Sequence, residues 1–212
     1  MDKIVIWGAS GHAMVVADII RLQGQYQIVG FLDNINHQRH NNAFYGSQIL
    51  GGEEQLDKLR IQGVNFLIFG FGNGKARLKL TDLVKLKGFQ LPSAIHPDSI
   101  IASDVTIGPG TVVAAGAVIN PKCLIGENVI INTSSSVDHE CVIEDGAHIC
   151  PGAHLAGKVT VGRAAWVGIG ACVIDHISIG EESLIGAGAV VIKDVPDHAV
   201  AYGNPAKAKK TR

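Results

Sequence analysis

The second half of the chain carries an aliphatic residue at every sixth position, from Ile95 to Val191 without exception. Four residues after each of these positions stands a small or aliphatic residue, in a series that runs from Ser99 to Ala189. A period of six fits neither the helical period of about 3.6 nor a simple two-residue alternation. It is typical of a β-helix, in which each hexad supplies one short strand and one turn. The pattern therefore predicts a three-sided prism of stacked coils, with three hexads in each coil.

Residues 1–90 follow a different pattern, in which short apolar runs alternate with segments of helical spacing. We expect strands at 3–7, 27–32 and 65–69, helices at 12–22, 53–59 and 76–86, and a loop at 34–48. Alternating strands and helices predict a small parallel sheet with helices on its faces. Pro92 and Pro97 interrupt regular structure and mark the boundary between the two halves of the chain. We therefore expect an α/β domain over residues 1–92 and a β-helix over residues 93–212.

The two ends of a β-helix expose unpaired backbone, which promotes aggregation unless other segments cover it. We expect the first domain to cover one end and the tail from Ile192 to cover the other.

Composition narrows the functional classes. The 212 residues carry a net charge of −1, so the chain lacks the basic footprint of a nucleic-acid-binding protein. No apolar run approaches the roughly 20 residues needed to span a bilayer, and the start of the chain lacks the features of a signal peptide. We therefore expect a cytoplasmic protein without membrane insertion. The four cysteines form no CxxC motif, and Cys123 and Cys141 fall in the small series, where buried thiols are expected.

His139 is the strongest candidate for catalytic chemistry. It stands two residues after the aliphatic position Val137, so it should lie at a corner of the prism and project outward. Histidine suits a general base because its pKa lies near neutrality. Glu140 follows directly and is able to orient the ring, as a carboxylate does in a catalytic triad. The alternative is an ordinary turn histidine with a solvated neighbour.

Three loops of the first domain are candidates for ligand binding. The turn Gly8-Ala-Ser-Gly11 joins a strand to a helix, where glycines and a helix N-terminus favour a phosphate. It lacks the complete GxGxxG pattern of dinucleotide redox enzymes. Asp33 ends the second strand, where an acid is able to accept hydrogen bonds from a ribose or a base. Gly70–Gly74, with Asn73, forms the third loop. The alternative for all three is tight-turn geometry alone.

Three segments, Gly8–His12, Asn132–Glu140 and Gly203–Lys207, together with the hexads, resemble the nucleotide-aminosugar acetyltransferases of the PglD/NeuD type. These belong to the superfamily of left-handed β-helix acyltransferases. The resemblance covers essentially the whole chain. It implies a left-handed β-helix and a homotrimer with active sites between neighbouring prisms. It also implies that acetyl-CoA lies in the groove between two prisms, while the α/β domain binds a nucleotide-linked sugar.

The same resemblance assigns roles to individual residues. It makes His139 the general base and Glu140 its partner. Expected contacts of acetyl-CoA are His148, Gly157, Ile169, Gly170, Ala187, Gly188 and Lys207. Expected contacts of the nucleotide-sugar are Gly8, Ser10, Gly11, His12, Asp33, Asn34 and Asn73. Asn34 replaces an aspartate that relatives often carry, which leaves uridine, guanosine and thymidine open as the nucleoside.

The resulting hypothesis is an N-acetyltransferase that modifies a 4-amino-4,6-dideoxy sugar for a surface glycan. Direct transfer is expected because the segment Asn132–Glu140 contains no cysteine to carry the acyl group. One alternative is O-acetylation, as in sialic acid O-acetyltransferases, and another is a non-enzymatic scaffold trimer. A zinc site like that of γ-type carbonic anhydrases is not expected, since the histidine spacing differs and His139, His148 and His154 point to different edges. His154 is expected to be structural.

Overall fold

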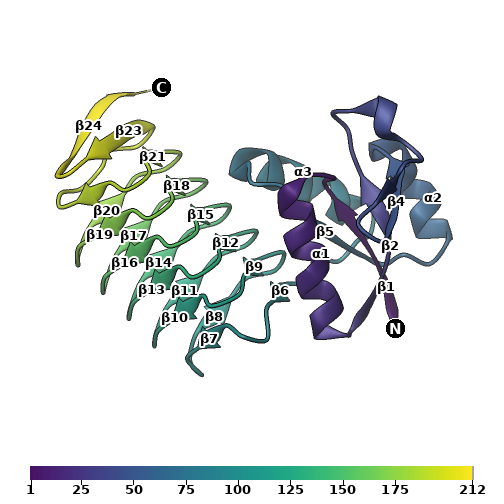
Figure 1. Cartoon of the computed structure of the whole chain (residues 1–212), viewed down its shortest axis with the longest axis horizontal. Coiled ribbons are helices and arrows are strands. Elements are labelled where there is room, and N and C mark those ends of the chain that lie inside the picture. The colour runs from purple at the N-terminus through teal and green to yellow at the C-terminus, as the bar shows by residue number, and fades with distance from the viewer. Residues whose placement is uncertain (212) are drawn as a thin grey trace.

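The computed structural model describes residues 1–211, in which an α/β fold precedes a β-helix (Figure 1). The first part contains a five-stranded sheet with the strand order β3-β4-β2-β1-β5. Its strands are β1 (Asp2–Trp7), β2 (Tyr26–Leu32), β3 (Ala43–Phe44), β4 (Ser47–Gly51) and β5 (Phe66–Phe69). Its helices are α1 (Gly11–Gln23), α2 (Leu56–Ile61) and α3 (Gly74–Leu86), with short 3-10 turns at His37–Arg39 and Glu53–Gln55. The sheet is parallel except for the β3–β4 pair.

Both faces of this sheet are covered, which explains why the central strands are continuously apolar. Helix α1 packs on one face through its buried stripe of Ala13, Val16, Ala17, Ile19 and Ile20. It ends at Gly24, which adopts the left-handed conformation that glycine favours at a helix C-terminus. Helices α2 and α3 contribute Leu56, Leu59 and Val84 to the core on the other face.

The prediction of a loop over residues 34–48 is wrong in its second half. The segment contains the antiparallel hairpin β3–β4, which turns at Tyr45 and Gly46. Both turn residues have positive φ, as in the two-residue turns that match strand twist. Strand β4 then pairs with β2 at the edge of the sheet. The polar composition of this segment gave no signal for a hairpin. Strand β4 is fixed by its pairing with β2 and not by a local sequence pattern.

The second half of the chain forms the three-sided prism that the hexads predict. The first face is made of β6 (Ala94–Ile95), β9 (Val112–Val113), β12 (Ile130–Ile131), β15 (His148–Ile149), β18 (Trp166–Val167), β21 (Leu184–Ile185), β23 (Ala199–Gly203) and β24 (Ala206–Thr211). The second face is made of β7 (Ile100–Ile101), β10 (Val118–Ile119), β13 (Ser136–Val137), β16 (His154–Leu155), β19 (Cys172–Val173) and β22 (Val190–Val191). The third face is made of β8 (Thr106–Ile107), β11 (Leu124–Ile125), β14 (Val142–Ile143), β17 (Thr160–Val161) and β20 (Ser178–Ile179).

The prism interior is built from the two six-residue series, as expected. Residues of the aliphatic series such as Ile131 and Val167 are fully buried, and so are Ala147 and Ala165 of the small series. Each strand pairs in parallel with the strand one coil away, so the inward side chains stack in columns. Cys123 and Cys141 stand in one such column as buried free thiols, which confirms their prediction.

The α/β domain lies along the side of the prism, not over its end (Figure 1). Helix α1 packs on the first face, where Ala94, Val112 and Ile130 point outward and are buried in the same core cluster as the helix. The expectation that this domain covers one end of the prism is therefore wrong. The apolar outward residues of the first face explain the placement, because packing against α1 removes them from solvent.

The tail does cover the other end, as predicted. Strand β23 continues the first face by pairing in parallel with β21, and β24 returns antiparallel to β23. Ala199 and Ala201 of β23 join the prism core. No helix among the described residues is long and apolar enough to cross a membrane.

Candidate active site

A cavity of about 590 Å³ opens at the carboxyl ends of β1, β2 and β5. We name it the edge cavity. The sheet reverses its strand order between β1 and β5, and such a switch point is where open α/β sheets bind ligands. Its lining includes Gly8, Ser10, Asp33, Asn34 and Asn73, five of the seven residues predicted to contact a nucleotide-sugar. Gly11 borders a separate hollow beside α1 and His12 is mostly buried, so neither lines this cavity.

Gly8 lets two backbones meet at the floor of the edge cavity. Its φ is +139°, and a Cβ at this position would lie 2.6 Å from the carbonyl oxygen of Gly70. Two residues later Ser10 is the N-cap of α1, yet its hydroxyl makes no capping hydrogen bond. The first turn of α1 therefore presents free N–H groups and a free hydroxyl. This is the arrangement that binds a phosphate at a helix N-terminus.

The loop after β2 is organised by Asp33. Its Oδ1 accepts hydrogen bonds from the backbone N–H groups of Ile35 and Asn36, at 2.9 and 3.1 Å. Its Oδ2 lies 3.6 Å from Nη1 of Arg39, which also donates to the carbonyl of Ala9 at 2.7 Å. Asp33 therefore holds the loop and the cation of Arg39 at the cavity rim. A direct contact between Asp33 and a ribose stays a prediction.

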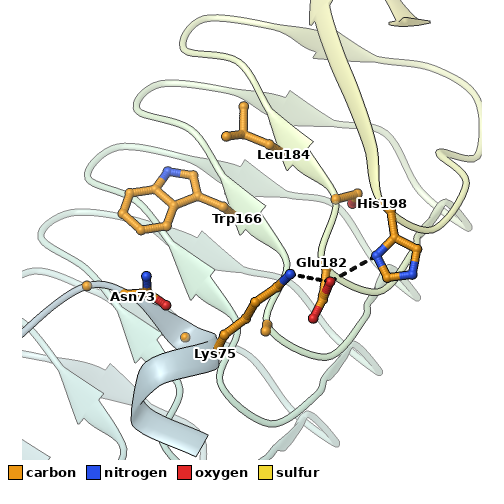
Figure 2. A pocket seen from close by; sticks show the side chains of 10 residues that line it. Asn73, Lys75, Trp166, Glu182, Leu184 and His198 are labelled. Atoms are coloured by element: carbon orange, nitrogen blue, oxygen red, sulfur yellow. Dashed lines mark ion pairs between the residues drawn. The ribbon is translucent and has the colours of Figure 1, made fainter. Parts of the chain in front are cut away.

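A second cavity, also of about 590 Å³, lies between α3 and the upper coils of the prism (Figure 2). We name it the ledge cavity. It shares Gly72 and Asn73 with the edge cavity, so the loop between β5 and α3 separates the two. Asn73 caps α3 by accepting a hydrogen bond from the N–H of Ala76 at 3.0 Å. Trp166 and Leu184 provide an apolar wall on the first face, as Figure 2 shows.

Across the ledge cavity, Glu182 contacts two side chains from different elements. It pairs with Lys75 at the start of α3, and it lies 2.9 Å from Nδ1 of His198 in the coil above (Figure 2). These pairs lower the pKa of Glu182, with the Lys75 hydrogen bond contributing most. They tie the α/β domain to the upper prism.

His148 lies under the α/β domain and is only 6% exposed. Asn132 fixes its tautomer. The Oδ1 of Asn132 accepts a hydrogen bond from the N–H of Thr133 at 2.8 Å, so its amide nitrogen faces Nε2 of His148 at 3.0 Å. Nε2 is therefore the acceptor, and Nδ1 carries the proton. The ring packs against that of Trp166 in a tilted arrangement, with centroids 4.2 Å apart and planes at 59°. Contact of His148 with acetyl-CoA stays a prediction.

His12 stands across from His148, with ring centroids 6.3 Å apart. Burial, and then the charge of Arg77, lower the pKa of His12 to about 4 and that of His148 to about 3. Both rings are therefore uncharged at neutral pH. His12 Nε2 and His148 Nδ1 have no hydrogen-bond partner among the described residues.

These two histidines predict a loss of stability in mild acid. Their pKa values are lower in the folded chain than the ordinary 6.5, so below pH 6.5 the unfolded chain binds more protons. The free energy of unfolding should fall by about 1.4 kcal/mol per histidine for each pH unit below 6.5, and be unaffected above it. Urea unfolding between pH 7 and 5.5 measures this slope. The variant His148→Gln should lose about half of it, whereas His154→Gln, at an exposed site, should retain it; equal slopes in both variants would contradict the assignment.

His139 lies at the corner between β13 and β14, as predicted, and its side chain is 53% exposed. We name the turn Asp138–Cys141 the histidine corner. Nδ1 of His139 lies 3.1 Å from Oε2 of Glu140, so the carboxylate orients the ring and leaves Nε2 free. Asp138 accepts hydrogen bonds from the backbone N–H of His139 and from Asn120, each at 2.8 Å, which lowers its pKa and fixes the turn. The histidine corner presents an imidazole ring on a rigid support, and its role as a general base stays a prediction.

Gly157 belongs to this corner, one coil above His139. A Cβ at Gly157 would lie 2.5 Å from Cε1 and 2.7 Å from Nε2 of the His139 ring. Its absent side chain therefore makes room for the imidazole.

We expect Gly157→Ala to displace the ring of His139 without unfolding the protein, because an exposed side chain moves at low cost. Turnover should fall about 10-fold or more, since small misplacements of a catalytic group are costly. Steady-state kinetics and thermal melting measure the two effects. In a His139→Ala background the same change should cost no further turnover, because the displaced ring is absent; additive losses would refute this explanation.

The other residues predicted to contact the cofactor lie elsewhere. Ile169, Gly170, Ala187 and Gly188 stand at the corner between the first and second faces, which we name the glycine corner. Ile169 is 62% exposed there. Lys207 is exposed on β24, opposite Tyr202. The second face separates the glycine corner from the histidine corner, so one protomer does not bring the two together.

Sequence reasoning missed several residues that shape this region. Trp166 and Asn132 surround His148, and Arg77 contacts both halves of the chain. Trp166 has a sequence signal, because it stands three hexads after His148 and so must neighbour it on the same face. Arg77 has none, since a helical arginine is usually exposed. Among the described residues, no three histidine, cysteine or acidic side chains gather as metal ligands would.

Comparisons with known proteins place the chain in a family. Residues 3–84 match the model of the PglD N-terminal domain family. The chain is 32% identical over 176 residues to GDP-perosamine N-acetyltransferase from Escherichia coli O157:H7, covering 80% of this chain and 77% of the relative. It is also similar to two solved structures, each over 98% or more of both chains. PerB from Caulobacter crescentus, in complex with CoA and GDP-perosamine, gives a TM-score of 0.91 at 38% identity. The acetyltransferase domain of PglB from Neisseria gonorrhoeae FA1090, in complex with acetyl coenzyme A, gives a TM-score of 0.91 at 36% identity.

The protein belongs to the nucleotide-aminosugar N-acetyltransferases. The membership confirms the expected fold class, an α/β domain followed by a left-handed parallel β-helix. It also confirms that the chain is an acyltransferase, which overturns the alternative of a non-enzymatic scaffold.

Proposed function

We propose that the protein transfers the acetyl group of acetyl-CoA to the amine of a 4-amino-4,6-dideoxy sugar linked to a nucleoside diphosphate. The observation that carries the proposal is the oriented His139–Glu140 pair on a chain whose α/β domain holds a cavity at the switch point of its sheet. The relatives support the choice of substrate, because the Escherichia coli protein is named for GDP-perosamine and PerB holds CoA with GDP-perosamine. GDP-perosamine is therefore the first acceptor to test.

The edge cavity is the proposed site of the nucleotide part. The free N–H groups and the Ser10 hydroxyl at the start of α1 suit the diphosphate, and the Arg39 cation at the rim adds charge attraction. The apolar walls of the cavity, which include Phe71 and Leu80, suit the flat faces of a nucleobase.

His139 is the proposed general base. The sugar amine attacks the thioester carbonyl to form the new C–N bond and gives a proton to Nε2 of His139. The C–S bond then breaks, and the imidazolium passes that proton to the departing sulfur, so that CoA leaves as the thiol. Glu140 stabilises the imidazolium that forms, through the contact with Nδ1. Cys141 is the last residue of the histidine corner, but it does not serve as an acyl carrier. It is fully buried, and both its hydrogen bond with Cys123 and its burial raise the pKa of its thiol.

A homotrimer is the proposed working unit. The histidine corner lies between the second and third faces, whereas the edge cavity lies beside the first face. A second copy would set its histidine corner against the glycine corner and edge cavity of its neighbour. Three prisms around an axis satisfy this arrangement for every copy, as a closed ring requires. Acetyl-CoA would then lie between prisms. We propose the cytoplasm as its location and surface glycan synthesis as its process.

The experiment is an acetylation assay with mass-spectrometric detection. The acceptors are GDP-perosamine, UDP- and dTDP-linked 4-amino sugars, and free sialic acids. We expect one acetyl group on the amine of a nucleotide-linked sugar and none on sialic acid. Acetylation of sialic acid alone would instead establish the O-acetyltransferase alternative. Initial-rate kinetics should show a ternary complex; a ping-pong pattern would contradict direct transfer.

A further inference from the structure

Arg77 is the most deeply buried cation of the described chain. It lies in the first turns of α3 and is only 1% exposed. Burial lowers the pKa of Arg77 to about 10, which still leaves the guanidinium charged at neutral pH. No carboxylate among the residues that the structure describes pairs with it. A buried charge without a counter-ion is costly unless hydrogen bonds compensate for the lost solvent. The acceptors that surround the guanidinium of Arg77 therefore decide what this residue does.

The guanidinium holds three separate segments through their backbone carbonyls. Nε donates to Asn128 at 3.0 Å and Nη2 donates to Gly146 at 2.8 Å, in successive turns of the β-helix between the third and first faces. Nη1 donates to Phe71 at 3.1 Å, in the loop between β5 and α3. The planar fork of an arginine is suited to several acceptors in fixed directions. Arg77 therefore clamps the loop of the α/β domain to the prism.

The clamped loop is the wall between the two cavities. Gly72 and Asn73 line both of them. A Cβ at Gly72 would lie 3.2 Å from the ring of Trp166 and 3.6 Å from that of His148, so the loop rests directly on the first face. A small shift of this loop would change the direction in which a ligand of the edge cavity projects toward the prism.

We infer that Arg77 is a positioning residue, which fixes the nucleotide-sugar cavity relative to the prism face that carries His148 and Trp166. The inference rests on the proposed function, because it requires the edge cavity to hold the acceptor. It concerns the acceptor only. The glycine corner and the histidine corner make no contact with Arg77 and do not depend on it.

The chain offers two matched controls. Arg163 lies in the turn one coil above Gly146, is exposed, and pairs with Asp145 at 3.3 Å. Its replacement tests the general effect of losing an arginine near this corner. Thr81 accepts a hydrogen bond from the side chain of Asn128 at 2.8 Å. Thr81→Val therefore weakens the same contact between domain and prism but leaves the guanidinium in place.

The experiment compares Arg77→Lys, Arg77→Met, Arg163→Met and Thr81→Val with the wild type. It measures kcat, the KM for the nucleotide-sugar, the Kd for CoA and the melting temperature of each full-length protein. We expect both Arg77 variants to lose about 10-fold or more in kcat/KM for the acceptor while CoA binding stays within about twofold of the wild type. Lysine should restore only part of the loss, because one ammonium cannot reach three carbonyls. The two controls should keep wild-type acceptor kinetics, even where Thr81→Val melts earlier.

The results separate positioning from mere stability. If Arg77→Met does not fold, Arg77→Lys decides. Wild-type acceptor kinetics in a folded Arg77 variant would overturn the inference. So would an equal loss of acceptor and CoA affinity, or the same acceptor defect in Thr81→Val. Absence of acetyl transfer by the wild type itself would instead refute the proposed function, so the two failures are distinguishable.

Discussion

Replacement of His139 by alanine is expected to lower kcat by about 10²–10⁴-fold, the range that a general base contributes. The reason is that Nε2 of His139 is free to accept the proton of the attacking amine, while Nδ1 is held by Glu140 at 3.1 Å. Because the side chain is half exposed at a turn, its loss should leave the melting temperature and CoA binding near the wild type. Single-turnover acetylation at saturating substrates measures the effect on chemistry.

His176 provides a matched control for this prediction. It lies two coils above the histidine corner, at the same edge of the prism, and its Nδ1 is 2.8 Å from a carboxylate oxygen of Asp175. It is thus a second exposed histidine with an acidic neighbour. His176→Ala should retain turnover within about twofold of the wild type, since surface substitutions away from a site have small effects. A near-normal kcat in His139→Ala would remove His139 from the role of base.

Gly8→Ala is expected to lower the free energy of unfolding by about 2–5 kcal/mol and to abolish acceptor binding. Two costs add: the backbone at φ +139° is strained for any residue with a Cβ, and that Cβ would meet the Gly70 carbonyl at 2.6 Å. Relief requires β1 and β5 to separate at the floor of the edge cavity. Urea unfolding measures the stability, and calorimetric titration with GDP measures the binding.

Gly11→Ala is the control for Gly8→Ala, in the same turn. Nothing lies within 4 Å of a Cβ at Gly11, and its φ is not positive. Stability should therefore stay within about 0.5 kcal/mol of the wild type. If the Gly8→Ala variant were as stable as the wild type, the close approach of the Gly8 and Gly70 backbones would not be needed for stability.

The hexad pattern made the prism predictable because each position has one fixed direction. An unbroken phase places every sixth side chain inside, and it places His139 outside at a corner, as the structure confirms. The repeat also predicts which side chains are neighbours, because residues three hexads apart lie one above the other on the same face. His148 and Trp166 are such a pair, one coil apart on the first face.

Contacts between the two halves of the chain were not predictable from local pattern. The buried side of α3 carries Arg77, Thr81 and Val84. Two of these three side chains are polar, so the sequence pattern predicts a solvent-exposed side there. The position of α1 along the first face depends on outward apolar residues such as Val112 and Ile130. A hexad repeat constrains the inward residues and says little about the outward ones. The burial of His148 results from the contact between the α/β domain and the first face, which the repeat does not predict.

The central claim is that the histidine corner of one protomer acts on an acceptor held by the α/β domain of another. Mixed oligomers of two inactive variants test it most directly: His139→Ala, which lacks the base, and Ala76→Trp, which fills the edge cavity that Ala76 lines. Each protein alone should be inactive. If the site is shared, purified mixed trimers should recover about a third of the wild-type rate, because one interface in each ring joins an intact base to an intact cavity. Mixed trimers as inactive as either parent would contradict the account.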